Sequence, residues 1–189
     1  MRPVHALRAF AYGVVAYAVG FAAILAIIYW RYQDAVEWAD ASLAEVVSVT
    51  AWVYHGGHFV GVSGPAPALF GETHNVVREP EMGLPIALVF TIPVVVLLVV
   101  GFAHSWRSMG HHTYKRQGRK IGAEIAIGYG ITAFVVALWS VETVPVLFGS
   151  IAVGPDLGMT VLMMGIIYPV VFGGIGGWLY QGAANEGWM

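Results

Sequence analysis

The chain contains no cysteine, and only 11% of its 189 residues are Asp, Glu, Lys or Arg. The absence of cysteine excludes a disulfide framework, a thiolate zinc site, cysteine-bound iron–sulfur clusters and a thiol nucleophile. Soluble domains carry about 25% charged residues, so the low charge excludes an ordinary water-soluble enzyme and a disordered regulator. The formal net charge of −2 lacks the basic excess of a nucleic-acid-binding protein. We therefore expect no nucleic acid partner.

Hydrophobic residues make up 58% of the chain and gather in four long uncharged runs. About 20 apolar residues in a helix cross a hydrocarbon core of about 30 Å. A helix also satisfies its own backbone polar groups, which lipid cannot do. The sequence therefore predicts an all-α integral membrane protein, a four-transmembrane-helix bundle, with residues 1–189 as a single membrane domain. The predicted spans are residues 9–30, 84–103, 121–141 and 159–180.

Basic residues gather on one side of these spans, mainly in the loop 104–120. Cytoplasmic loops carry the excess of Lys and Arg, so we expect this loop and the N- and C-termini to be cytoplasmic. The insertion 31–83 is then extracellular, and a fifth crossing through residues 46–71 would place the basic loop outside. Basic side chains near a membrane attract anionic lipid headgroups. We therefore expect bound lipids at Arg107, Lys115, Arg116, Arg119 and Lys120.

The extracellular insertion is too apolar for a plain loop. Between residues 43 and 54, apolar side chains recur at helical spacing on one face. An interfacial helix and a partly re-entrant helix both fit this pattern. The insertion is therefore predicted to be helical, with its depth in the membrane left open.

Small residues form narrow stripes along the predicted spans. Such stripes let membrane helices approach closely, so they are expected to be packing seams. They also align between spans: Tyr12 and Gly13 match Tyr129 and Gly130, which suggests two parallel helical-hairpin repeats or a chance match of apolar sequences. The predicted helix-packing residues are Ala9, Gly13, Ala16, Gly20, Gly130, Ala133, Ala137, Gly173 and Gly177.

Histidines and carboxylates in the insertion suggest a metal site. Imidazole and carboxylate groups bind zinc or copper, and His55, His58, Glu72 and His74 are the candidate ligands. The pair Gly56–Gly57 weakens the helix that would present the two histidines, and the alternative is that water or backbone groups satisfy them. Haem is not expected because no span has a central histidine. No cofactor is predicted beyond this zinc or copper possibility.

Ionisable residues inside membrane spans usually mark proton or ion pathways. The predicted spans carry none at mid-depth, although Thr91, Tyr129, Thr132 and Tyr168 are polar. Glu124 lies near the inner end of the third span, four residues after Lys120. An ion pair at the headgroup level explains it, with a proton site as the alternative.

Residues 1–13 and 51–60 resemble an uncharacterised family of small multi-span membrane proteins of halophilic archaea. Members of that family have an aromatic-rich segment ending in His-Phe-Val after the first span, as in residues 58–60 of this chain. The resemblance implies a plasma-membrane location and an acidic exterior that faces salt. Some members carry a generic transporter label, and the resemblance implies no functional residue.

Three functions fit the sequence. The first is a non-enzymatic subunit of a homo- or hetero-oligomeric membrane assembly, which packs through the small-residue seams. The second is a small transporter or permeation protein for a small solute, supported by the apparent repeat. The third is a metal-binding membrane enzyme that uses the histidines of the insertion. No convincing catalytic set is present, which favours the first.

Overall fold

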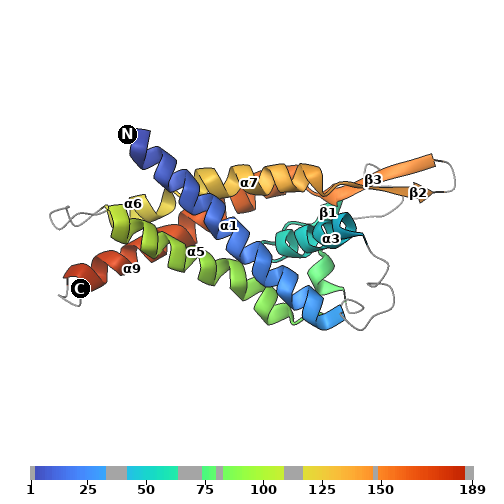
Figure 1. Ribbon diagram of the computed structural model, residues 1–189, viewed down its shortest axis with the longest axis horizontal. Coiled ribbons are helices and arrows are strands. Elements are labelled where there is room, and N and C mark those ends of the chain that lie inside the picture. Colours follow the sequence, from blue (N-terminus) through green and yellow to red (C-terminus); the bar gives the residue numbers. More distant parts are fainter. Residues whose placement is uncertain are drawn as a thin grey trace.

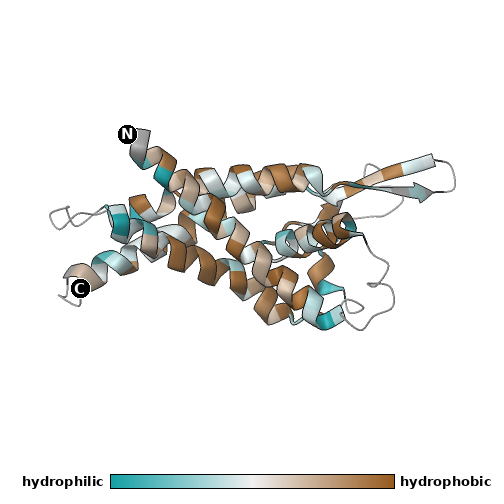
Figure 2. Cartoon of the chain, in the orientation of Figure 1, coloured by the Kyte–Doolittle hydropathy of each residue, from teal (hydrophilic) through white to brown (hydrophobic). Residues whose placement is uncertain are grey.

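The computed structural model describes residues 3–32, 42–63, 74–79, 83–108, 117–146 and 149–185. Four of its helical segments are long and apolar enough to cross a membrane, namely His5–Tyr32, Ile86–Ser108, Gly118–Trp139 and Leu157–Ala184. They pack side by side along the long axis of the molecule (Figure 1), and apolar residues dominate their length (Figure 2). The predicted four-helix membrane bundle is confirmed.

The first and second spans are the helices α1 (Pro3–Tyr32) and α5 (Ile86–Ser108). The third span is broken: α6 (Gly118–Ala123) ends before Glu124, and α7 (Ala126–Trp139) begins after Ile125. The fourth span starts with α8 (Leu157–Met159) and ends with α9 (Gly174–Asn185). Between them lie two π-helical stretches, η3 (Thr160–Ile167) and η4 (Pro169–Gly173), which flank Tyr168.

The two ends of the bundle differ. The first turns of α1 and the last turns of α9 lie together at one end (Figure 1), which also carries Arg8, Arg107 and Lys120. We call this the basic end. The opposite end carries the helix α3 (Leu43–Gly56), the short 3₁₀ helix η1 (Val76–Arg78) and a small sheet. We call this the sheet end.

The sheet is an element that the sequence analysis did not predict. It has three antiparallel strands in the order β1-β3-β2, with β1 (Val62–Ser63), β2 (Glu142–Val146) and β3 (Gly149–Pro155). In the hairpin β2–β3, Thr143 pairs with Ala152 and Val144 with Ile151. The hairpin segment is rich in β-branched residues, which favour strands over turns. The hairpin is short and lies between two much longer apolar runs.

Small residues lie where the helices touch. A Cβ added at Gly130 would lie 2.7 Å from Gly165 Cα in the fourth span, and a Cβ at Gly13 would collide with the Ile125 carbonyl in the third. Gly101 and Gly173 meet backbone to backbone in the same way. The predicted seams therefore lie inside one chain. The matched residues Gly13 and Gly130 have different partners, so the repeat stays a prediction.

Candidate functional site

The helix α3 begins at a strong N-terminal cap at the sheet end. The Ser42 backbone N–H donates to Glu45 Oε2 at 2.7 Å, and the Glu45 backbone N–H donates to Ser42 Oγ at 3.3 Å. This reciprocal pair satisfies backbone donors that the first turn leaves without helical partners. The cap fixes the start of α3, and the helix then runs from this end into the bundle.

Two side-chain hydrogen bonds fasten α3 to the junction of α7 and β2. Ser48 Oγ donates to Glu142 Oε1 at 2.7 Å, and Trp52 Nε1 donates to the Ser140 carbonyl at 2.9 Å. At the sheet end, α1 and α5 diverge from α7, and α3 lies in the space between them (Figure 1). The helix therefore fills the bundle at this end instead of resting on its surface.

The last turns of α3 reach the central part of the spans. Tyr54, His55 and His58 are fully buried. The Tyr54 hydroxyl lies 2.7 Å from the hydroxyl of Tyr129, which is at the middle of the span Gly118–Trp139. A Cβ at Gly20, within α1, would collide with the Tyr54 ring. The end of α3 therefore packs among the spans, which favours the partly re-entrant of the two predicted arrangements.

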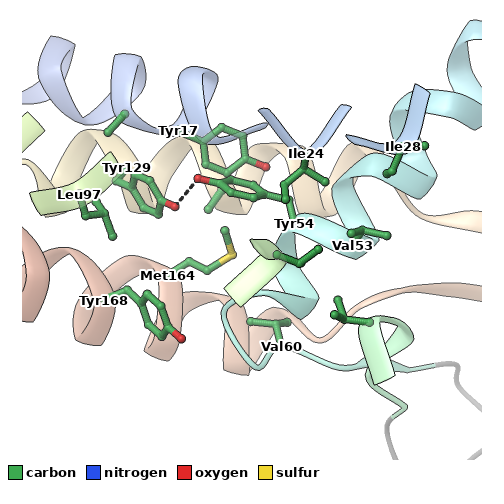
Figure 3. Packing of buried hydrophobic residues seen from close by; sticks show 14 of the residues in the cluster. Tyr17, Ile24, Ile28, Val53, Tyr54, Val60, Leu97, Tyr129, Met164 and Tyr168 are labelled. Carbon is green, nitrogen blue, oxygen red and sulfur yellow. Dashed lines mark hydrogen bonds between the residues drawn. The ribbon is translucent and has the colours of Figure 1, made fainter. Parts of the chain in front are cut away.

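His58 ends a directed chain of hydrogen bonds. Its Nδ1 lies 2.8 Å from the Tyr54 carbonyl, which can only accept, so Nδ1 carries a hydrogen. Burial lowers the pKa of His58, which lies outside the four spans, to about 3, so the ring is neutral and Nε2 is an acceptor. Tyr129 donates its hydroxyl hydrogen to Nε2 at 2.7 Å, and Tyr54 donates to Tyr129 (Figure 3). Protonation of His58 would reverse the two bonds that involve Tyr129 and leave the Nδ1–H bond to the Tyr54 carbonyl unchanged.

Two more tyrosines surround this chain. The Tyr168 ring lies 4.7 Å from the His58 ring, and its hydroxyl donates to the Gly57 carbonyl at 3.4 Å. The Tyr17 ring lies 5.1 Å from that of Tyr54. Its buried hydroxyl has no hydrogen-bond partner in the described part of the chain. Together these residues form what we call the tyrosine–histidine cluster: Tyr17, Tyr54, His58, Tyr129 and Tyr168.

A second polar group lies at the basic end. His104 of α5 is 1% exposed and packs against Tyr12 of α1, with 5.0 Å between the rings. Its Nε2 lies 3.9 Å from Oε2 of Glu124. Leu97, two turns before His104, and Ile125, one turn before Tyr129, are fully buried. An apolar layer thus separates this group from the tyrosine–histidine cluster.

Of the predicted metal ligands, the structure describes His55, His58 and His74 and does not bring these three together. His55 is bound through Nδ1 to the Ala51 carbonyl at 2.7 Å, so backbone groups hold both buried histidines. His74 is exposed and lies 3.6 Å from Glu79, while Glu72 is outside the described residues. Within the described ranges, no three His, Asp or Glu side chains are placed to hold a metal ion. His55 and His58 each form a hydrogen bond to a backbone carbonyl, which is the alternative to metal binding that the sequence left open.

The structure describes three of the five residues predicted to bind lipid headgroups. Arg107, Arg119 and Lys120 are exposed at the basic end, whereas Lys115 and Arg116 lie outside the described residues. Arg8 donates from its guanidinium to the Arg107 carbonyl at 3.2 Å, which joins α1 to the end of α5. The exposed cations are therefore held close to the helix ends.

The sequence analysis placed the histidines outside the bundle; it named Tyr129 and Tyr168 as polar residues of the spans but did not pair them with the histidines. Tyr17, Tyr129 and Tyr168 each lie in the middle third of a span. Tyrosine is commonest at the membrane interface, so three tyrosines at mid-span were the available signal. The aromatic His-containing segment of the insertion supplies hydrogen-bond partners for the hydroxyls of Tyr129 and Tyr168.

Four apolar helices long enough to cross a membrane, with α3 packed among them, define a polytopic membrane protein. The model of a family of unknown function, DUF7978, matches residues 2–184, and the chain belongs to that family. The match extends over almost the whole chain, whereas the resemblance noted above rested on its first third. The comparisons with curated proteins and with solved structures found no match.

Proposed function

We propose that this protein is a small permeation protein, which carries a small polar solute or ion along the bundle axis and binds it at the tyrosine–histidine cluster. The main support is that His58 and the hydrogen-bonded hydroxyls of Tyr54 and Tyr129 are buried among the middle parts of the spans. Polar groups inside a membrane bundle are costly and usually mark a substrate or ion path. A chain needed only to hold helices together could use apolar packing at lower cost.

In this proposal α3 is the plug at the sheet end. It covers the tyrosine–histidine cluster and is fastened by the bonds of Ser48 and Trp52, so the cluster is reached when these bonds open. The π-helical stretches on both sides of Tyr168 support this role. Such stretches are rare and occur frequently at functional sites.

The charge pattern gives the proposed orientation. The basic end faces the cytoplasm, in accordance with the excess of Lys and Arg in cytoplasmic loops. The sheet end then faces outside, as expected for a multi-pass plasma-membrane protein. Solute would enter from the outside when α3 moves and leave past His104 and Glu124 at the basic end.

Flux into vesicles tests the proposal. The purified protein is reconstituted into liposomes, and the entry of small polar solutes and of monovalent ions is followed. Tyr129→Phe removes only the hydroxyl at the centre of the chain, and Tyr180→Phe, near the basic end, is the matched control. We expect flux with the wild type and the control, and a loss of at least about tenfold with Tyr129→Phe. Vesicles no more permeable than protein-free ones would contradict the proposal.

A subunit role in a membrane assembly is the second candidate. The seams predicted for it lie inside the chain, but α1 exposes a separate face of small residues, Ala11, Ala18, Ala22 and Ala26. Close approach of a second helix needs such a face. Mass measurement of the detergent-solubilised protein should show an oligomer that Ala22→Leu dissociates. A monomer in the wild type would remove this candidate.

A further inference from the structure

The polar group at the basic end contains a buried histidine with an unused ring nitrogen. His104 Nε2 has no hydrogen-bond partner among the described residues, although the ring is almost completely buried. Its other nitrogen, Nδ1, lies 3.4 Å from Ser108 Oγ on the same helix. Leaving a buried polar atom unpaired costs about 1–3 kcal/mol. A native protein that keeps such an atom has a use for it.

The unused nitrogen faces a carboxylate. Glu124 Oε2 is 3.9 Å away, beyond hydrogen-bond range but close enough for a small side-chain movement to close the gap. Glu124 lies at the break between α6 and α7, so it is not held inside a continuous helix. Its side chain is 19% exposed, which links the buried histidine to water at the basic end.

One proton fits between these two groups. With both deprotonated and the imidazole hydrogen on Nδ1, toward Ser108, Nε2 and the carboxylate are two acceptors that face each other. A proton taken from water makes the pair neutral overall and allows an N–H···O bond between imidazole and carboxylate. The Tyr12 ring, beside the imidazole, can also stabilise its cationic form.

The surrounding charges keep this proton exchangeable. His104 interacts electrostatically with His5 and Arg8 of α1. Glu124 interacts in the same way with Lys120 of α6 and with His5. The facing stretches of α7 and α9 carry no charged side chain. Burial opposes the charged form of both groups, and the charges of Arg8 and Lys120 favour the carboxylate and oppose an imidazolium, so neither a permanent ion pair nor a permanent carboxylic acid is imposed.

We propose that His104 and Glu124 form a proton-binding pair that takes one proton from the aqueous phase at the basic end. Its role rests on the proposed function: the proton is the ion coupled to solute movement. The buried layer of Leu97 and Ile125 separates the pair from the tyrosine–histidine cluster. That layer prevents a continuous proton leak, so solute and proton cross only when the bundle changes conformation.

Infrared difference spectroscopy of the purified protein during a pH titration tests proton binding. We expect a protonated-carboxyl band that Glu124→Gln removes. In His104→Gln the midpoint of that band should move by at least about one pH unit, a tenfold change in proton activity, because strongly coupled groups titrate as a pair. The exposed pair His74 and Glu79, 3.6 Å apart, is the matched control. Glu79→Gln should leave the Glu124 band unchanged.

A reciprocal measurement tests the pair without the His104 variant, in case that variant does not fold. With isotope-labelled histidine, the ring bands of His104 should titrate in the wild type and change their midpoint in Glu124→Gln. Equal midpoints in wild type and variants would overturn the proton-binding pair. In the vesicle experiment, a pH dye should record proton uptake with solute in the wild type and not in Glu124→Gln. If His104 and Glu124 titrate as a pair but the protein moves no solute, the proposed function is refuted and the proton-binding pair is not. If the protein moves solute but the two residues do not titrate as a pair, only the proton-binding pair is refuted.

Discussion

Removing the Tyr129 hydroxyl tests the hydrogen-bond chain most simply. Tyr129→Phe keeps the ring and its packing, so the change in the free energy of unfolding reports the hydroxyl and leaves no cavity. Two bonds of 2.7 Å are lost, one to Tyr54 and one to His58. Interhelical hydrogen bonds in membranes average about 0.6 kcal/mol, which gives about 1 kcal/mol for two. The imidazole nitrogen left unpaired adds about 1–3 kcal/mol.

We therefore expect Tyr129→Phe to destabilise the protein by about 2–4 kcal/mol in denaturant titrations in mixed micelles. Tyr180→Phe, for which no hydroxyl hydrogen bond is found in the described structure, should stay within about 0.5 kcal/mol of the wild type. A double-mutant cycle with Tyr54→Phe should show that the two losses are not additive, since they share a bond. A Tyr129→Phe protein as stable as the Tyr180→Phe control, or strict additivity, would refute the chain.

Three further predictions concern packing, pH and the plug. Gly173→Ala should prevent normal folding, because the new Cβ would lie 2.7 Å from a backbone oxygen of α6. The control is Gly182→Ala, whose new Cβ would have nothing within 4 Å and which should fold like the wild type. Equal yields of folded protein from the two variants would contradict this packing. The folded pKa of His58 of about 3 lies below its ordinary value of 6.5, so the unfolded state binds more protons between these values. The thermal midpoint should therefore fall as the pH drops below about 6.5, and less steeply in His58→Gln; parallel curves would count against a buried neutral His58. Trp52→Phe removes the N–H that binds the carbonyl at the end of α7, so amide hydrogen exchange in α3 should accelerate, whereas Trp178→Phe, which is 59% exposed, should leave α3 unchanged.

The four spans could be predicted because lipid imposes a simple rule. Stretches without charge, bounded by residues such as Arg31 and Arg107, must be about 20 residues long to cross a bilayer. The small residues at helix contacts follow equally simple chemistry, because close approach excludes larger side chains. Whether a seam such as that of Gly130 faces its own chain or another copy depends on tertiary arrangement, which spacing does not encode.

The depth of α3 could not be predicted for a related reason. Charge placement excluded a fifth crossing through residues 46–71, but it does not distinguish an interfacial helix from a partly re-entrant one. The burial of His58 depends on the hydroxyl of Tyr129 and the ring of Tyr168, more than 70 residues further along the chain. The partnership of His104 with Glu124 is non-local in the same way. The sequence indicated only the neighbouring Lys120 as a partner.

The nitrogen NMR signals of the His58 ring test the central claim, that α3 enters the bundle and binds Tyr129. With ring-labelled histidine in the purified protein, we predict a neutral ring with hydrogen on Nδ1 at pH 7 and an Nε2 resonance that shifts in Tyr129→Phe. A His58 ring that titrates like free histidine, or an Nε2 resonance unaffected by Tyr129→Phe, would contradict the account.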